Sequence, residues 1–453
     1  MSQDTRTRLK QWLESGEARL QPLTLPQREL WEASPVPAGD VANHICALIN
    51  VRGPITQKGC EAAVQKVADR QEVFRLSFLP GKGQPMQMIR KSSKQTLCFR
   101  ELNPEQQHPE AVEELAREIF RKPFDMVGGP LYRSEVLRRS SDDHVLVLAI
   151  HHAIADGWTV GVFVQDLFAA YMQDLRGIPG GLPPVTLSYT EWGAAERAFW
   201  QPAVLGERSA FWKDRLDKVT PLWAPPTGPA ALSGERHRWV SSAPEKIGRA
   251  VRELAKRNGA TLFSTLLAAF QVTLSKWTGK DDILVGTPVA NRGKQAVRET
   301  MGYCAGIVPL RGKIDRDRTF SQRLRAVHES TIESFANAMP FAELVKALDV
   351  ERAAGCNPLF QVRFALQNHP VPDISVNGMS LQLRMRSTGT CRFDLACEVT
   401  EEGEALEVVW LFRPDLFSED DIQNLHRMYL GVLTSVCSSP EILTSALMTT
   451  TLG

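Results

Sequence analysis

Residues 145–158 read VLVLAIHHAIADGW and carry the pattern that decides the fold. Six consecutive apolar residues at 145–150 are typical of a strand that is buried on both faces. His151 and His152 follow at the end of this strand, and a short loop then leads through Asp156 and Gly157. Apolar residues recur at helical spacing over 159–175, which predicts an amphipathic helix. The predicted order is strand, His-His, Asp-Gly turn and helix.

This layout suits acid/base chemistry, because a strand brings imidazoles to its open end beside the free N–H groups of a helix N-terminus. The alternative is a purely structural histidine pair that makes hydrogen bonds beside a turn. Two adjacent histidines, an aspartate four residues after the second and then a glycine form a tighter pattern than a lone histidine. The pattern therefore indicates a candidate site.

Length and composition set the limits of the interpretation. With 453 residues, of which 43% are hydrophobic, the chain is too long for one ordinary core, so two lobes are expected. Its 53 Lys and Arg against 52 Asp and Glu give no reason to expect nucleic acid or an anionic membrane as a partner. The first twenty residues are charged, and no apolar run reaches the length of a membrane span. A cytoplasmic protein is predicted.

The cysteines are scattered and form no CxxC pair, so they are expected to be reduced, buried small apolar residues rather than ligands or disulfides. They are Cys46, Cys60, Cys98, Cys304, Cys356, Cys391, Cys397 and Cys437. A metal site at His151, His152 and Asp156 is the weaker alternative, because no third ligand motif of the HExxH type accompanies them. No metal is predicted.

A Gly/Pro cluster marks the expected boundary between the lobes. Residues 177–184 read GIPGGLPP, and neither a helix nor a strand runs through such a stretch. The predicted division is an N-terminal lobe at 1–176 that carries the His-His loop, a linker at 177–184 and a C-terminal lobe at 185–453.

His151 to Gly157 resembles the HHxxxDG motif of the condensation domains of nonribosomal peptide synthetases, which belong to the acyltransferases built like chloramphenicol acetyltransferase. Other segments resemble that family in the expected order along essentially the whole chain. Two of them differ from it in residue type, since Gln71 replaces the usual His, Phe74 the usual Leu, and Gly306-Ile307 the usual Asn-Thr. The segments are 23–31, 70–78, 187–192, 286–292, 301–311, 340–345, 357–362 and 392–395.

The resemblance implies the fold. We expect an α/β protein with two lobes like chloramphenicol acetyltransferase, arranged as a V-shaped pseudodimer with a tunnel between them. The C-terminal lobe repeats the layout of the first, with a strand at 406–411 and a helix capped by Ser418 with Asp421 three residues on, but without histidines. A strongly apolar helix is also expected over 261–277, with Thr261 as N-cap, followed by a strand at 283–285. One active site per chain follows.

The resemblance also implies amide formation between a donor acyl thioester and an amine. His152 is the expected base or positioning group for the amine, and the Gly157 N–H the expected oxyanion donor, unless that glycine serves the turn alone. His151 is expected to support the fold. Trp158 and Tyr303 are candidates for lining the substrate tunnel.

A second pair of residues is expected to hold the loop in place. Family members carry an arginine at the position of Arg292 that pairs with the aspartate of the motif, here Asp156. The alternatives are Arg292 as a solvated charge and Asp156 as a member of a catalytic His-Asp pair. A pairing with Arg292 would fix the loop.

Subtype and partners follow from the same resemblance. The motifs of cyclising and dual epimerising relatives are not seen, and Met1 lies about twenty residues before the first family segment, which suits a starter condensation domain. Such a domain takes its acyl group from acyl-CoA and passes it to an aminoacyl group on a peptidyl carrier protein, beside an adenylation domain. No bound cofactor is expected, because the substrates are carried as phosphopantetheine or coenzyme A thioesters. An internal domain with a carrier-bound donor and a non-catalytic docking module are the alternatives.

Overall fold

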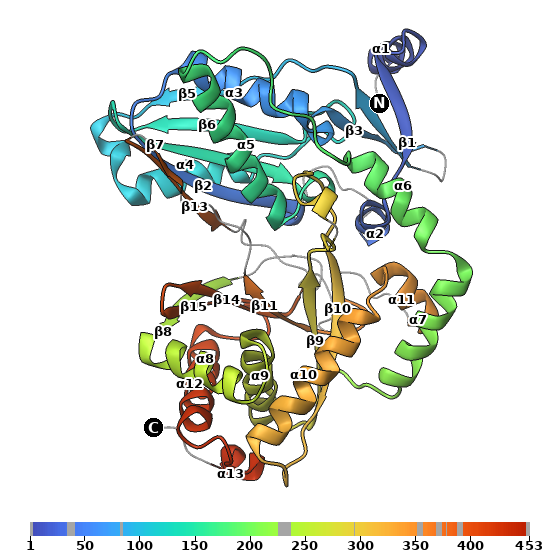
Figure 1. The fold of residues 1–453 in the computed structure, drawn as a ribbon, viewed down its shortest axis with the longest axis vertical. Helices are drawn as coiled ribbons and strands as arrows, with labels where there is room; N and C mark the ends of the chain where they lie inside the picture. The colour runs from blue at the N-terminus through green and yellow to red at the C-terminus, as the bar shows by residue number, and fades with distance from the viewer. Residues whose placement is uncertain are drawn as a thin grey trace. The chain divides into compact units, whose positions relative to one another are not determined.

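The computed structural model describes two compact units, each built on a six-stranded sheet (Figure 1). Unit 1 is Met1–Gln201, Ala290–Ala305 and His369–Thr388, and unit 2 is Pro202–Val289, Gly306–Asn368 and Gly389–Gly453. The described residues are 3–33, 41–81, 85–224, 237–293, 295–350, 357–367, 374–376, 378–386 and 393–449. Among them, no helix has the length and apolarity needed to cross a membrane.

The predicted strand at 145–150 is confirmed as β7 (Asp143–His151), a central strand of the unit 1 sheet. It pairs antiparallel with β2 (His44–Arg52) on one side and β6 (Tyr132–Arg138) on the other. The full order is β12 (Ile374–Val376), β13 (Met379–Arg386), β2, β7, β6 and β5 (Cys98–Glu101). Residues 144–151 are all buried, as a strand covered on both faces requires.

Helices cover both faces of this sheet. Leu146, Leu148 and Ile150 of β7 join the core formed with α3 (Gln57–Arg70) and α5 (Gly157–Leu175). The alternate residues, such as Val147, join the core formed with α4 (Pro109–Phe120) on the opposite face. A small sheet of β1 (Ala18–Pro22), β4 (Met86–Arg90) and β3 (Leu76–Leu79) and the helices α1 (Gln3–Glu14), α2 (Leu25–Ala33) and α6 (Tyr189–Phe199) complete unit 1.

Unit 2 has helices packed around one buried helix. The predicted helix at 261–277 is confirmed as α9 (Leu262–Thr278), whose N-cap Thr261 accepts from the N–H of Ser264. Around it pack α8 (Glu245–Arg257), α10 (Phe320–Ala336), α12 (Glu419–Ser438) and α13 (Thr444–Thr449). Unit 2 also contains α7 (Pro202–Arg215) and α11 (Phe341–Ala347).

The strands of unit 2 mix parallel and antiparallel pairs. Their order is β10 (Gly306–Lys313), β9 (Asp282–Val289), β11 (Val362–Gln367), β14 (Leu395–Glu402), β15 (Ala405–Phe412) and β8 (His237–Ala243). Among the described strands of this sheet, only β11 runs parallel to its neighbours. The predicted strands at 283–285 and 406–411 are parts of β9 and β15, and Ser418 and Asp421 form the predicted capping box of α12.

The boundaries of the two compact units differ from the predicted limits of the lobes. Residues 177–184 lie within unit 1, and the change of unit falls between Gln201 and Pro202. Two later segments also belong to unit 1, because 290–305 packs on the His-His loop and β13 pairs with β2 at the sheet edge. Pairing between segments so far apart in sequence leaves no local compositional signal.

Candidate active site

The His-His loop connects β7 to α5 through a single turn of 3-10 helix at His152–Ile154. Asp156 is the N-cap of α5, and its carboxylate accepts from the Thr159 N–H at 2.9 Å and from the Thr159 hydroxyl at 2.9 Å. The Thr159 hydroxyl in turn accepts from the Asp156 N–H at 3.3 Å, which completes a capping box. The Asp-Gly turn is thus the start of the helix, two residues before the predicted start at 159.

The structure brings Asp156 and Arg292 together. Nη2 of Arg292 lies 3.1 Å from each carboxylate oxygen of Asp156, and the side chains are only 1% and 4% exposed for Arg292 and Asp156, respectively. The carboxylate also accepts from the backbone N–H groups of Cys304 at 3.0 Å and Ala305 at 3.2 Å. A carboxylate with both oxygens engaged in this way suits the predicted ion-pair role, since a buried charge must be paired and hydrogen-bonded.

Arg292 is held as firmly as its partner. It donates to the backbone carbonyls of Val297 at 2.9 Å, Thr300 at 2.5 Å and Gly302 at 3.0 Å. Burial disfavours its charge, but the neighbouring groups, with the Asp156 carboxylate first among them, together raise the pKa of Arg292 above its ordinary value. The guanidinium therefore ties the segment 290–305 to the start of α5 by charge-assisted hydrogen bonds.

His151 is built into the core of unit 1. It is buried, and its Nδ1 accepts from the N–H of Ala153 at 3.1 Å. Its ring packs edge-on against the rings of His44 at 5.9 Å and Phe124 at 6.2 Å, measured between centroids. An imidazole that accepts at Nδ1 carries its proton on Nε2 when neutral. This placement suits the structural role predicted for His151.

His152 is half-buried, and its ring lies edge-on to Tyr303 with 4.5 Å between the ring centroids. Tyr303, also half-buried, accepts at its backbone carbonyl from the hydroxyl of Tyr189 at 3.0 Å. Gly157 is the first residue of α5, where a backbone N–H has no acceptor within the helix. The imidazole and this helix N-terminus are five residues apart on one short loop.

Trp158 is placed against the segment 290–305. Its indole N–H donates to the carbonyl of Arg298 at 2.8 Å, and the guanidinium carbon of Arg292 lies 5.9 Å from its ring centroid. Cys304, whose backbone N–H binds Asp156, is fully buried, and burial raises the pKa of its thiol well above the ordinary value. A thiol kept neutral in this way is a poor nucleophile.

Two glutamines support this arrangement and had no predicted role. Gln27 donates to the carbonyl of Ala153 at 3.0 Å from the start of α2. Gln71 donates to the carbonyl of Glu299 at 2.9 Å and accepts from the N–H of Met301 at 3.0 Å. Both glutamines lie in segments that resemble the family, and Gln71 stands where the family usually carries a histidine. Their place in these segments was the only feature of the sequence that could have indicated a supporting role.

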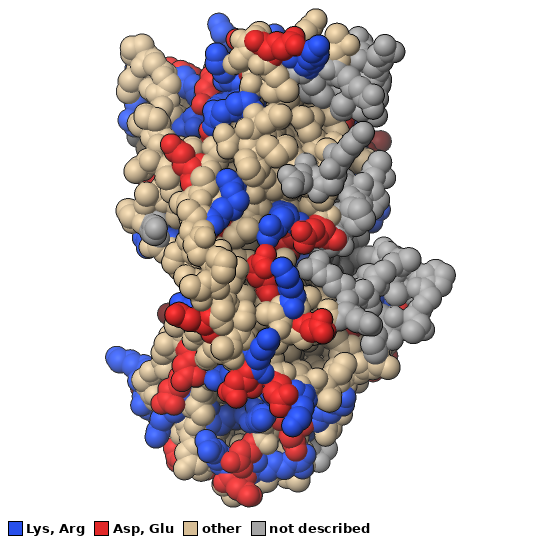
Figure 2. Space-filling model, turned by 90° about the vertical axis from the view of Figure 1, so that its right-hand side faces the viewer, with Lys and Arg blue, Asp and Glu red and all other residues tan. Residues whose placement is uncertain are grey.

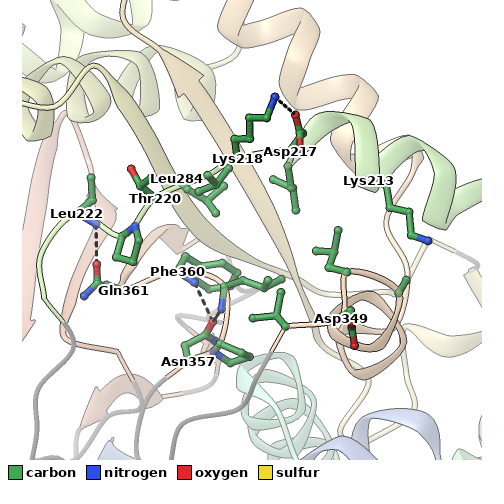
Figure 3. Close-up of a pocket in the computed structure, with 18 of the residues that line it drawn as sticks. Lys213, Asp217, Lys218, Thr220, Leu222, Leu284, Asp349, Asn357, Phe360 and Gln361 are labelled. Carbon is green, nitrogen blue, oxygen red and sulfur yellow. Dashed lines mark hydrogen bonds and ion pairs between the residues drawn. The ribbon is translucent and has the colours of Figure 1, made fainter.

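A pocket of about 710 Å³ lies in unit 2 and contains none of the predicted site residues (Figure 3). Leu284 and Phe360 form part of its apolar wall. Asn357 accepts from the N–H of Phe360 at 3.1 Å, and Gln361 accepts from the N–H of Leu222 at 2.8 Å, so the predicted segment 357–362 is tied down at this pocket.

Two further features bear on the predicted chemistry. The described residues contain no group of three His, Cys, Asp or Glu that could hold a metal ion. The six described cysteines are free thiols, but the expectation that they are buried is wrong for Cys98, which is exposed. Cys356, Cys391 and residue 392 of the last family-like segment lie outside the described residues.

Comparison with known proteins gives the family. The model of the condensation domain matches residues 17–451. One polypeptide of the linear gramicidin synthase of Brevibacillus parabrevis is 30% identical over 94% of this chain, and phosphinothricin tripeptide synthetase PhsC of Streptomyces viridochromogenes is 30% identical over 92%. The chain spans 8% and 39% of the lengths of these two relatives.

Solved structures share the fold. The condensation domain of the monacolin K polyketide synthase MokA matches with a TM-score of 0.82 at 20% identity, over 94% of this chain and 99% of that one. The starter condensation domain of rhizomide synthetase RzmA, bound to C8-CoA, matches with 0.81 at 17% identity, over 94% and 96%. The two α/β lobes of the chloramphenicol acetyltransferase type are thereby confirmed. This chain belongs to the condensation-domain family of nonribosomal peptide synthetases, acyltransferases that form amide bonds.

Proposed function

We propose that this domain joins a donor acyl thioester to the amine of an aminoacyl thioester carried by a peptidyl carrier protein. The amine nitrogen attacks the thioester carbon, the carbon–sulfur bond breaks, and the acyl group stays on the amine while the thiol that carried it leaves with the proton lost by the amine. An α-amino group titrates near 7.7 to 8.0, so part of it is already neutral at neutral pH. The site therefore has to orient the amine and stabilise the oxyanion.

The observation that carries this proposal is the half-buried His152 on a loop fixed at both ends. β7 holds its beginning, and the ion pair of Asp156 with Arg292 holds the start of α5. We assign His152 to the amine, as base or as positioning group, and the Gly157 N–H to the oxyanion. Asp156, Arg292 and His151 position the loop, and Trp158 and Tyr303 are the proposed contacts of the substrate path.

We further propose acyl-CoA as the donor, which makes this a starter condensation domain that acts beside an adenylation domain. The proposal of this donor is motivated by the fold shared with the starter domain of rhizomide synthetase, whose solved structure is a complex with C8-CoA. The free thiols of the described cysteines fit a reducing compartment, and we propose the cytoplasm. An internal domain with a carrier-bound donor is the second candidate.

The test incubates the purified chain with an acyl-CoA series and an aminoacyl-loaded carrier, and detects the N-acylated product by mass spectrometry. Product from coenzyme A donors is the expected result, and it also gives the preferred acyl length. Product only from a carrier-bound donor would replace the starter assignment by the internal one. If neither donor gave product while the carrier still bound, the domain would be a non-catalytic docking module.

A further inference from the structure

A second pocket of about 500 Å³ lies within unit 2, between the C-terminal end of α7, the sheet-edge strand β10 and α10. Five basic and two acidic residues line it, an excess of three positive charges in a chain whose net charge is +1. They are Arg215, Arg311, Lys313, Arg318 and Arg323 against Asp214 and Asp315.

Three of these cations already have acidic partners. Arg215 pairs with Glu333 at 3.0 Å, Arg311 with Asp282 at 2.6 Å, and Arg318 with Asp315 at 3.1 Å. Such pairs are common on this protein, and Figure 2 shows Lys and Arg interspersed with Asp and Glu on the face in view. These pairs neutralise the local charge of the three arginines.

Arg323 differs from these three because it is buried and its bonds go to uncharged groups. It is 4% exposed, and it donates to the carbonyl of Lys313 at 3.1 Å and to Oε1 of Gln271 at 3.0 Å. Its Nε is buried and has no partner, and no carboxylate within the described ranges forms an ion pair with it. Lys313, which is exposed, also lacks an ion pair there.

The surroundings of Arg323 are built to hold it in place. A Cβ at Gly312 would lie 2.2 Å from Oε1 of Gln271, so a larger residue at this strand position would displace the amide that accepts from the guanidinium. Gln271 itself is buried in α9. The charged side chain is therefore fixed by two elements, β10 and α9, in addition to its own helix.

An arginine in this position is costly. Arg323 is the fourth residue of α10, near the positive end of the helix dipole, where a cation is disfavoured. Burial lowers its pKa to about 10, which still leaves it charged at neutral pH. A buried cation needs a counter-charge, and the protein's own carboxylates do not supply one among the described residues.

We propose that this pocket binds a small molecule bearing a phosphate monoester, with Arg323 and Lys313 providing its positive charge. A guanidinium is well suited to phosphate, because its planar N–H groups form charge-assisted bonds with the oxygens. The pocket volume lies in the range of small-molecule sites, roughly 300–1,000 Å³, which leaves space for the group esterified to the phosphate. The site is formed within unit 2 and does not depend on the proposed acyl transfer.

The test is calorimetric titration of the full chain at constant ionic strength with AMP, adenosine and inorganic phosphate as probes. The variants are Arg323→Met and, as a control, Arg325→Met, which removes the same charge from an exposed position two residues on. Wild type and the control are expected to bind AMP. Arg323→Met is expected to bind it at least about tenfold more weakly, the effect of losing a hydrogen bond to a charged group.

The probes separate the sources of the phosphate. Inorganic phosphate binding as tightly as AMP would make the free anion the ligand, with the same anchor. Adenosine binding as tightly as AMP, no binding of any probe, or equal AMP affinity in all variants would overturn the proposal. If Arg323→Met does not fold, Lys313→Glu decides instead, since weaker AMP binding is expected there and unchanged binding refutes the site. Amide formation by a folded Arg323→Met variant is expected to persist.

Discussion

The two units share a strand, loop and helix whose loops differ in chemistry. In unit 1, β7 leads through the His-His loop to α5, and in unit 2, β15 leads through residues 413–418 to α12. Both helices begin with a capping box, formed by Asp156 with Thr159 and by Ser418 with Asp421. A buried arginine also stands at each loop, Arg292 in unit 1 and Arg413 in unit 2.

The two loops differ in which segment of the chain supplies the buried arginine. Arg413 follows β15 directly and is 0% exposed, and it binds Asp415 at 2.6 Å and lies 3.7 Å from Asp394. In unit 1 the arginine comes from another segment, and the residue directly after the strand is His152. An arginine supplied by another segment stabilises the loop, and the residues of the loop itself then remain available for chemistry. We infer that this difference separates the reactive loop from the structural one.

The largest expected effect is on the reaction rate of His152→Ala. General acid–base groups contribute about 10²- to 10⁴-fold, so product formation should fall by that factor if His152 acts on the amine. The melting temperature should change little, because the imidazole is half-buried. His108→Ala is the control, since that histidine is exposed and makes no side-chain cap bond at α4. Unchanged turnover in His152→Ala would remove the catalytic assignment.

The two arginines provide the next test. Removing one partner of a buried ion pair costs about 3–5 kcal/mol, because the other charge stays buried without compensation. Arg292→Met and Arg413→Met should therefore both lower the free energy of unfolding by roughly this amount, as measured by urea titration. Only Arg292→Met should also lower the rate per folded molecule. A comparable rate loss in folded Arg413→Met would refute the division into a reactive and a structural loop.

Acid should weaken unit 2 through His426 of α12. Burial lowers its pKa to about 4, and its Nδ1 accepts from the indole N–H of Trp410 at 3.3 Å. The unfolded chain binds this proton near pH 6.5 and the folded chain near 4, so stability is retained above 6.5 and lost as the pH falls toward 4. The loss is about 3 kcal/mol at most. His426→Leu should flatten the unfolding free energy over this range, whereas profiles parallel to wild type would contradict the assignment.

The sequence predicted local features well and distant pairings only through the family resemblance. The strand at β7, the apolar helix α9 with its Thr261 cap and the capping box at Ser418 each depend on residues within one short stretch. Hydrophobic periodicity and cap chemistry are sufficient there. The pairing of Asp156 with Arg292 was expected because family members carry both residues, and the spacing of 136 positions carries no physical signal.

The contacts that the sequence did not predict are made by backbone groups or by strands that are far apart in the sequence. The N–H groups of Cys304 and Ala305 bind Asp156, and a main-chain donor can belong to any residue type. The entry of β13 into the unit 1 sheet likewise depends on ladder hydrogen bonds with β2. Gln71 forms hydrogen bonds with the backbone of Glu299 and Met301. Composition and periodicity do not predict which groups a buried glutamine will bind.

The smallest expected effect separates capping from ion pairing at the two loops. Ser418→Ala removes the cap of α12 and should cost about 1 kcal/mol without any change in rate, as is usual for an N-cap. Asp156→Ser keeps a good capping residue on α5 but leaves Arg292 buried without its carboxylate, so it should cost more and lower the rate. The unfolding free energies and rates of the two variants are compared directly. Equal costs with unchanged rates would mean that Asp156 is only a helix cap, and the loop of unit 1 would then be held no differently from that of unit 2.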